Sequence, residues 1–190
     1  MTWNTATQVG ALVLLALLIR AVFLWQLADS PLLHDLAADS AAYERLAHKL
    51  LTGEGLNESF LYQNPLYPFF LAGIHWLFGP GPFAVLSVQA FLDATSCALT
   101  YSIGRATFNH RIGQLACGLQ ATYGLLIFFC GLLLTTSLVV FLLLGLVATL
   151  LAAERHQRSS LFFLAGVLFA GVVLGRPNAL LLAGFLPLWF

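Results

Sequence analysis

Residues 132–153 read LLLTTSLVVFLLLGLVATLLAA and contain no charged residue. A helix needs about 20 mostly apolar residues to cross the hydrocarbon core of a bilayer. Backbone N–H and C=O groups left unpaired in hydrocarbon are very costly, so a long apolar run that enters a membrane must pair them within a helix. This stretch therefore predicts a transmembrane helix, and it decides the fold class of the chain.

The rest of the chain has the same character. Hydrophobic residues make up 60% of its 190 residues and charged residues only 8%, a composition that a water-facing globular surface does not allow. Another apolar run begins at Asn178, and complete runs occupy 9–27, 83–104, 112–130 and 161–175. We therefore expect an all-α, polytopic transmembrane helix bundle whose apolar faces contact membrane lipid.

Net charge and cysteine spacing argue against two classes of function. The formal net charge of zero disfavours a nucleic-acid partner. The cysteines Cys97, Cys117 and Cys130 stand singly in apolar runs, without the spacing of a metal site. We interpret them as small core residues.

The apolar piece 66–78 is too short to cross a membrane. Its 13 residues reach only about 20 Å at about 1.5 Å per residue, so we expect a juxtamembrane or re-entrant helix. If this helix does not cross, the arginines between the later spans all lie on the face opposite the loop 28–65, as cytoplasmic arginines should. These residues are Arg105, Arg111, Arg155 and Arg158.

The loop 28–65 is the polar part of the chain, and this topology places it on the outer side. Most of the acidic residues lie in it: Asp29, Asp35, Asp39, Glu44, Glu54 and Glu58. We expect a single membrane domain, 1–190, with a first span at 1–27, an outer loop with amphipathic juxtamembrane helices at 28–82, and further spans at 83–190. Because the sequence stops within an apolar run, we also expect the N-terminal portion of a longer protein.

Two segments of this loop have helical patterns. Residues 37–51 read AADSAAYERLAHKLL, with apolar residues at helical spacing opposite a charged face, as in a helix that lies in the membrane interface. Asp39 stands at its N-terminus. Residues 62–72 read YQNPLYPFFLA, where Asn64 can cap a helix whose first position is Pro65. Far along the chain, Arg176 and Pro177 interrupt an apolar run on the same outer side.

These features together resemble the N-terminal part of bacterial GT-C glycosyltransferases. The resemblance consists of an acid after the first span (Asp39), a tyrosine four positions later (Tyr43), a glycine pair, the sequence Pro-Leu-Tyr-Pro and a distant Arg-Pro near an outer membrane edge. The relatives in question are protein O-mannosyltransferases and the aminoarabinose and lipopolysaccharide-core sugar transferases. The similarity follows the order and spacing of nearly the whole chain.

The resemblance implies transfer of a sugar from a polyprenyl-phosphate carrier to an acceptor hydroxyl, at the periplasmic face of the bacterial inner membrane. It implies that Asp39 acts on the acceptor, which can be a lipid, a glycan or a protein. An inverting transfer needs one carboxylate near that hydroxyl. Arg176 could hold the carrier phosphate through a charge-assisted contact. Tyr43 and Tyr67 offer aromatic faces to a sugar or prenyl chain, and Asn64 and Asp35 complete the candidate substrate site.

Each of these residues also has a structural interpretation. Asp39 fits an N-cap, and Arg176 could reach lipid head groups from the end of a span. His34 and Asp35 could join Asp39 in holding a divalent cation, although acidic loop residues are usually only solvated. Tyr67 could simply begin a short helix.

Charges inside the spans are costly and should find partners. A structural pair between Arg20 and Asp93 is possible, and Gln89 lies one turn before Asp93 on the same helix face. We interpret these residues as a polar seam between helices.

Other functions remain open. Arg20, Gln89 and Asp93 could instead line the pathway of a small transporter or flippase subunit, although such proteins usually show paired broken helices or internal repeats. A non-catalytic GT-C fragment is a further alternative. GT-C enzymes often carry a second acid near the outer start of the span that here begins at Leu132, where this chain has Thr135, Thr136 and Ser137.

Overall fold

The computed structural model of the protein describes residues 5–28, 30, 38–54 and 64–184, and every regular element in these ranges is helical. The elements are α1 (Thr5–Leu27), α2 (Ala38–Thr52), α4 (Leu66–Phe78), α5 (Pro82–Thr107), α6 (His110–Ala121), α7 (Gly124–Cys130), α8 (Thr136–His156), α9 (Ser159–Gly175) and the 3₁₀ helix η2 (Pro177–Gly184). The predicted all-α fold is confirmed.

Within the described part of the chain, α1, α5 and α8 are long and apolar enough to cross a membrane. The run 112–130 was expected to be a single span; it is still long and apolar enough to be one, but it is a broken span and not one straight helix. It is divided into α6 and α7, which bend by 52° at a break formed by Thr122 and Tyr123. The helices α4 and α9 are apolar but shorter, and the run that begins at Asn178 forms part of η2.

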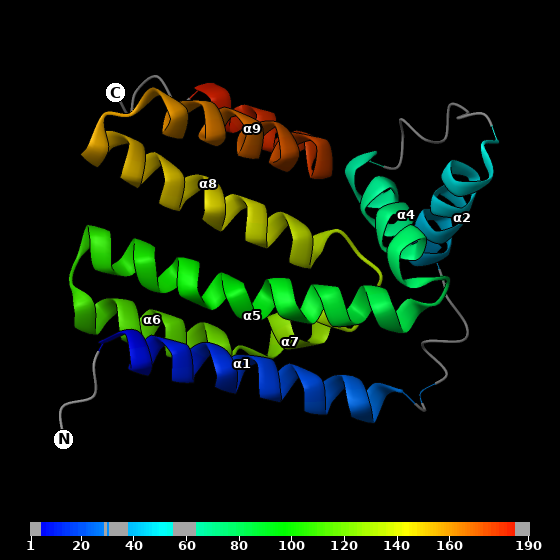
Figure 1. Ribbon diagram of the computed structural model, residues 1–190, viewed down its shortest axis with the longest axis horizontal. Coiled ribbons are helices and arrows are strands. Elements are labelled where there is room, and N and C mark those ends of the chain that lie inside the picture. Colours follow the sequence, from blue (N-terminus) through cyan, green and yellow to red (C-terminus); the bar gives the residue numbers. More distant parts are fainter. Residues whose placement is uncertain (1–4, 29, 31–37, 55–63, 185–190) are drawn as a thin grey trace.

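The long helices pack side by side into a bundle, and α2 and α4 lie together at one end of it (Figure 1). This is the end where α5 begins and α9 stops. The helix α4 contacts both α5 and α9, whereas the main contacts of α2 are with α4. The position of α2 relative to the bundle is therefore set largely through α4.

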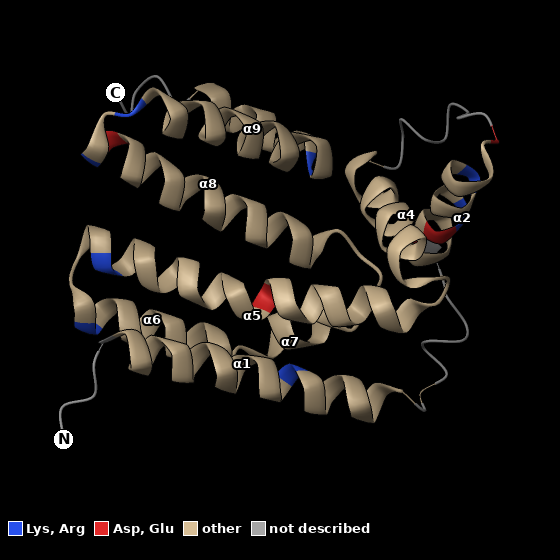
Figure 2. Ribbon diagram, viewed as in Figure 1, with Lys and Arg blue, Asp and Glu red and all other residues tan. Residues whose placement is uncertain are grey.

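Basic residues mark the opposite end of the bundle (Figure 2). Arg105 lies in the last turn of α5, Arg111 in the first turn of α6, Arg155 in the last turn of α8, and Arg158 immediately before α9. All four arginines are thus far from α2 and α4, which agrees with the predicted sidedness.

A buried ion pair holds the broken span in place. Arg20 is fully buried, and its Nε donates to Asp93 Oδ2 at 2.5 Å. Its Nη1 donates to the carbonyls of Ala16 and Ala121, both at 2.9 Å. The Ala121 carbonyl lies in the last turn of α6. Because the helix breaks there, this carbonyl has no helical N–H partner. The predicted Arg20–Asp93 pair is therefore present, and it stabilises the α6–α7 break.

Gln89 has the same role on α5, one turn before Asp93. Its Nε2 donates to the carbonyl of Leu132 at 2.8 Å and to that of Cys130 at 3.2 Å, where the chain leaves α7. These carbonyls would otherwise be unpaired in a medium without water. The expected polar seam of Gln89 and Asp93 thus satisfies backbone groups of an irregular segment within the bundle.

Candidate functional site

Tyr43 is the centre of a cluster at the α2–α4 end of the bundle. Its side chain is buried between the two helices, and its ring meets that of Tyr67 edge to face, with centroids 4.9 Å apart. Its hydroxyl shares a side-chain hydrogen bond with Asn64. Tyr43 thus connects α2 with both the beginning and the first turn of α4.

Two opposite charges act on the Tyr43 hydroxyl. Burial raises the pKa of this group above its ordinary value of 10.0, and the hydrogen bond with Asn64 partly offsets that rise. The nearby carboxylate of Asp39 raises the same pKa, and the guanidinium of Arg176 lowers it. Asp39 and Arg176 are far apart in sequence, yet both lie close enough to influence one hydroxyl.

Asp39 lies on the same side of α2 as Tyr43, about one turn earlier. The helix begins at Ala38, so Asp39 belongs to its first turn and is not the residue that precedes the helix. The positive end of the helix dipole favours a carboxylate at this position. The side chain is exposed, which leaves it open to a substrate.

Arg176 owes its position to the glycine before it. A Cβ on Gly175 would lie 2.6 Å from Val139 Cγ2 and 3.2 Å from Leu66 Cδ2, so only glycine lets α9 end directly against α8 and α4. The backbone of Arg176 is extended and its side chain is exposed. Among the described residues, neither Arg176 nor Asp39 forms an ion pair. Both charges are therefore available to a ligand.

Asn64 does not have the capping role that the sequence indicated. Pro65 occupies the N-cap position of α4, and no side chain caps this helix. Asn64 instead has a φ of 58°, a left-handed conformation that asparagine tolerates better than most residues. This conformation accompanies the side-chain hydrogen bond between Asn64 and Tyr43. The residue thus remains in the cluster, with a different function from a cap.

Tyr67 connects the cluster to the bundle. Its side chain is fully buried, stacks on Phe70 and donates its hydroxyl hydrogen to Gln89 Oε1 at 2.5 Å. Burial raises the pKa of the Tyr67 hydroxyl well above its usual range, and the neighbouring Tyr43 and Glu44 raise it further. The Tyr67 ring therefore packs against Tyr43 from the bundle side. Of the two tyrosines, only Tyr43 lies near the exposed charges of Asp39 and Arg176.

A sequence model of the dolichyl-phosphate-mannose-protein mannosyltransferase family matches residues 62–188. The chain belongs to this family. Comparisons with curated proteins and with solved structures gave no match. The predicted resemblance to GT-C glycosyltransferases is thereby confirmed.

Family membership and the apolar helices together identify an integral membrane protein of a glycosyltransferase family that uses lipid-linked sugar donors. The matched segment of this mannosyltransferase-family chain includes Asn64, Tyr67 and Arg176. It begins after Asp39 and Tyr43, so the roles of these two residues depend on the geometry of the cluster.

The possible cation site falls mostly outside the described residues. Both Asp35 and His34 lie there, so their relation to Asp39 stays a prediction. Within the described ranges, no three histidine, cysteine, aspartate or glutamate side chains are grouped in a way that could hold a metal ion.

Sequence reasoning missed one interaction near the cluster. Nε2 of His75 lies 3.0 Å from Glu44 Oε1 and 3.2 Å from Oε2, which joins α4 to α2. The signal was available, because His75 is the one strongly polar side chain in the sequence LYPFFLAGIHWLF of α4. A buried imidazole in such a helix needs a partner.

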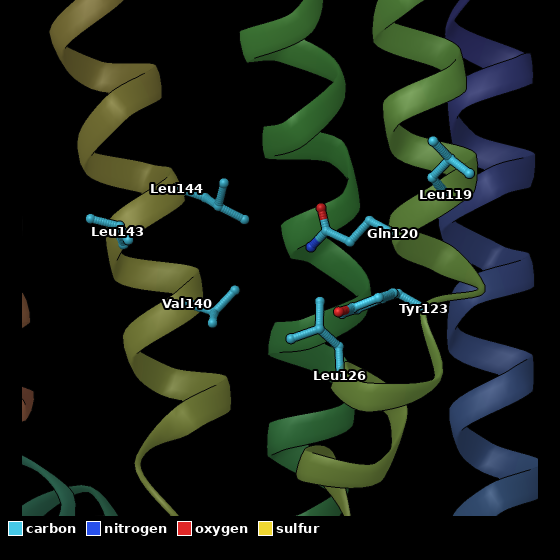
Figure 3. A pocket seen from close by; sticks show the side chains of 7 residues that line it. All are labelled: Leu119, Gln120, Tyr123, Leu126, Val140, Leu143 and Leu144. Carbon is cyan, nitrogen blue, oxygen red and sulfur yellow. The ribbon is translucent and has the colours of Figure 1, made fainter.

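A second feature of the mannosyltransferase-family chain is an apolar cavity of about 410 Å³ on the face between α8 and the broken span (Figure 3). It is lined by Leu119, Gln120, Tyr123, Leu126, Val140, Leu143 and Leu144. Gln120 accepts a hydrogen bond from Thr100, and its Nε2 has no partner within the described part of the chain. None of these residues belongs to the Tyr43 cluster, which remains the candidate site.

Proposed function

We propose that the protein transfers a sugar from a polyprenyl-phosphate donor to an acceptor hydroxyl, with inversion, at the end of the bundle formed by α2 and α4. We place this end at the periplasmic face of a bacterial inner membrane. The observation that carries the proposal is that Asp39 and Arg176, both exposed and without an ion-pair partner among the described residues, lie close enough to the Tyr43 hydroxyl to influence its pKa. The acceptor belongs to one of three classes, namely lipid, glycan or protein.

The two charges suit the two halves of the reaction. The acceptor oxygen attacks the anomeric carbon while the bond from that carbon to the phosphate oxygen breaks, and the phosphate leaves with the electron pair. Asp39 takes the proton of the acceptor hydroxyl as general base. Arg176 stabilises the negative charge on the departing phosphate.

The neutral residues of the cluster position these groups. In the proposed site Tyr43, which is protonated at neutral pH, offers a hydroxyl near both the base and the cation. Asn64 orients that hydroxyl, and the Tyr67 ring fixes the Tyr43 ring from behind. Held rigidly by packing and hydrogen bonds, these side chains lose little freedom when a substrate binds.

The bonds of Arg20, Asp93 and Gln89 weaken the transporter alternative. Arg20 and Asp93 pair with each other, and Arg20 and Gln89 donate to backbone carbonyls at the ends of α6 and α7. A polar pathway needs side chains that can exchange these partners for a substrate. The open charges lie instead at the surface, which favours chemistry there.

The proposal is tested by transfer of radiolabelled sugar from a panel of polyprenyl-phosphate sugars to membrane acceptors. The intact chain in a bilayer is compared with its Asp39→Asn variant, which keeps the shape of the side chain and removes the base. We expect the rate to fall by about a hundredfold or more, the usual contribution of a general base.

Glu54→Gln serves as the matched control, because Glu54 is an exposed acid just beyond α2 with no described ion-pair partner. It should transfer at the wild-type rate. Full transfer by Asp39→Asn would overturn the catalytic assignment. Absence of transfer by the wild-type chain from every donor would overturn the proposed activity.

A further inference from the structure

We infer that Glu44 and His75 form a positioning pair for the transfer site, an inference that rests on the proposed function. His75 Nε2 lies 3.0 Å from Glu44 Oε1, and this contact joins α4 to α2. The His75 side chain is only 4% exposed, whereas the Glu44 side chain is 33% exposed. A polar contact that is largely withdrawn from water is more rigid than a surface pair.

The pair completes a two-point attachment between the helices. Tyr43 reaches Tyr67 in the first turn of α4, while the next residue, Glu44, reaches His75 in the last turn. The two contact points on α4 are separated by about 12 Å along the helix axis, at about 1.5 Å per residue. Attachment at two separated points fixes the rotation of α2 against α4, which one contact alone would not.

The rotation of α2 against α4 matters because the two charges of the site, Asp39 and Arg176, are carried by different helices. Asp39 is carried by α2, whose main contacts are with α4. Arg176 follows α9, which packs against α4 and α8. The orientation of α2 on α4 therefore sets the separation of the base from the cation, so Glu44 and His75 act on catalysis through Asp39.

The imidazole depends on this one contact. Nδ1 of His75 is buried and has no hydrogen-bond partner among the described residues, so Nε2 makes the ring's polar connection. A side chain that places an N–H group at the position of Nε2 should preserve the connection. Glutamine does so, because its amide nitrogen lies about as far from the backbone as Nε2.

The first test compares His75→Leu with His75→Gln in the transfer assay with the intact chain. For His75→Leu we expect kcat to fall by about tenfold, which corresponds to about 1.4 kcal/mol of transition-state stabilisation, with KM for the polyprenyl-phosphate donor unchanged. KM should not change because Arg176 is not carried by α2. His75→Gln should recover most of kcat. Equal loss in both variants, or a change in KM without a change in kcat, would overturn the positioning role.

The second test does not depend on activity. Nitroxide labels at Arg45→Cys on α2 and Leu174→Cys on α9 report the distance between the two helices by electron spin resonance. Both positions are exposed, whereas Cys97, Cys117 and Cys130 are buried and should not react. We expect a single narrow distance distribution that broadens in His75→Leu and narrows again in His75→Gln.

An unchanged distribution in His75→Leu would overturn the inference. If the distribution broadens but the wild-type chain transfers no sugar, the pair holds α2 as inferred and the proposed function fails instead. The two failures are therefore distinguishable.

Discussion

Tyr43 and Tyr67 meet edge to face, with ring centroids 4.9 Å apart and an interplanar angle of 74°. Such pairs are favourable beyond the area that they bury. The two hydroxyls have different partners. The Tyr43 hydroxyl bonds to Asn64 near the exposed charges of Asp39 and Arg176, and the Tyr67 hydroxyl bonds to Gln89 inside the bundle. The same substitution at the two positions should therefore have different consequences.

Tyr43→Phe should reduce transfer more than it reduces stability. It keeps the aromatic contact but removes the hydroxyl on which Asp39 and Arg176 both act. We expect transfer to fall about tenfold, since one hydrogen bond contributes about 1 kcal/mol and bonds to charged groups more. The thermal unfolding midpoint should change little. A variant with wild-type transfer would exclude the Tyr43 hydroxyl from the site.

Tyr67→Phe should instead destabilise the protein. It leaves Gln89 Oε1 buried without its donor, which costs about 1–3 kcal/mol of unfolding free energy. Denaturant titration in a bilayer mimic measures this loss. If Tyr67→Phe unfolds like the wild type, the bond to Gln89 does not hold α4 on α5.

Alkaline pH provides a further test of the raised pKa of Tyr67. Above pH 10, the ordinary pKa of tyrosine, the unfolded chain loses the phenolic proton while the folded chain keeps it. Stability should therefore fall as pH rises from about 10 towards the folded-state pKa, by at most about 1.4 kcal/mol per pH unit for this residue. The slope of stability against pH should be shallower in Tyr67→Phe. Equal slopes would contradict the raised pKa.

Gly175→Ala should disturb the site from a position outside it. The added Cβ would lie 2.6 Å from Val139 Cγ2, so either the Val139 side chain or the end of α9 must move, and we expect α9 to move together with Arg176. We expect a loss of about 1–3 kcal/mol of stability together with weaker transfer. Gly166→Ala in the same helix is the matched control, because a Cβ there meets no atom within 4 Å. Similar behaviour of the two variants would mean that Gly175 does not position Arg176.

A double-mutant cycle tests the buried pair of Arg20 and Asp93. Replacing either residue alone by leucine leaves an unpaired charge in the bundle, which should cost about 3–5 kcal/mol of unfolding free energy. The double variant should cost clearly less than the sum of the two single variants. Additive losses would show that the two side chains do not interact in the membrane.

Much of the bundle could be predicted because hydropathy and charge act over whole segments. The runs 9–27, 83–104 and 132–153 correspond to α1, α5 and α8. The shortness of the run 66–78 separated α4 from these long, span-length helices. The costs of buried charge likewise predicted the pair of Arg20 and Asp93. These inferences need no knowledge of which helices are neighbours.

The remaining features depend on neighbours that a sequence does not reveal. The break in 112–130 is stabilised by Arg20 from α1, and the sequence of the run alone did not predict this break. The position of Asn64 before Pro65 suggested that it caps α4. In the folded chain α2 lies next to Asn64, and Asn64 bonds to Tyr43 instead. The contact of Glu44 with His75 was missed for the same reason.

The central claim is that Arg176 binds the carrier phosphate while Asp39 acts as the base of the same site. Its most direct test is the equilibrium binding of a polyprenyl phosphate to the Arg176→Gln and Asp39→Asn variants, with sugar transfer assayed on the same variants. Arg158→Gln, at the opposite end of the bundle, is the control. We predict that Arg176→Gln binds the lipid about tenfold more weakly, as the loss of one charge-assisted contact implies, while Asp39→Asn binds it normally and fails to transfer sugar. Unchanged binding by Arg176→Gln, with transfer intact in Asp39→Asn, would contradict the account.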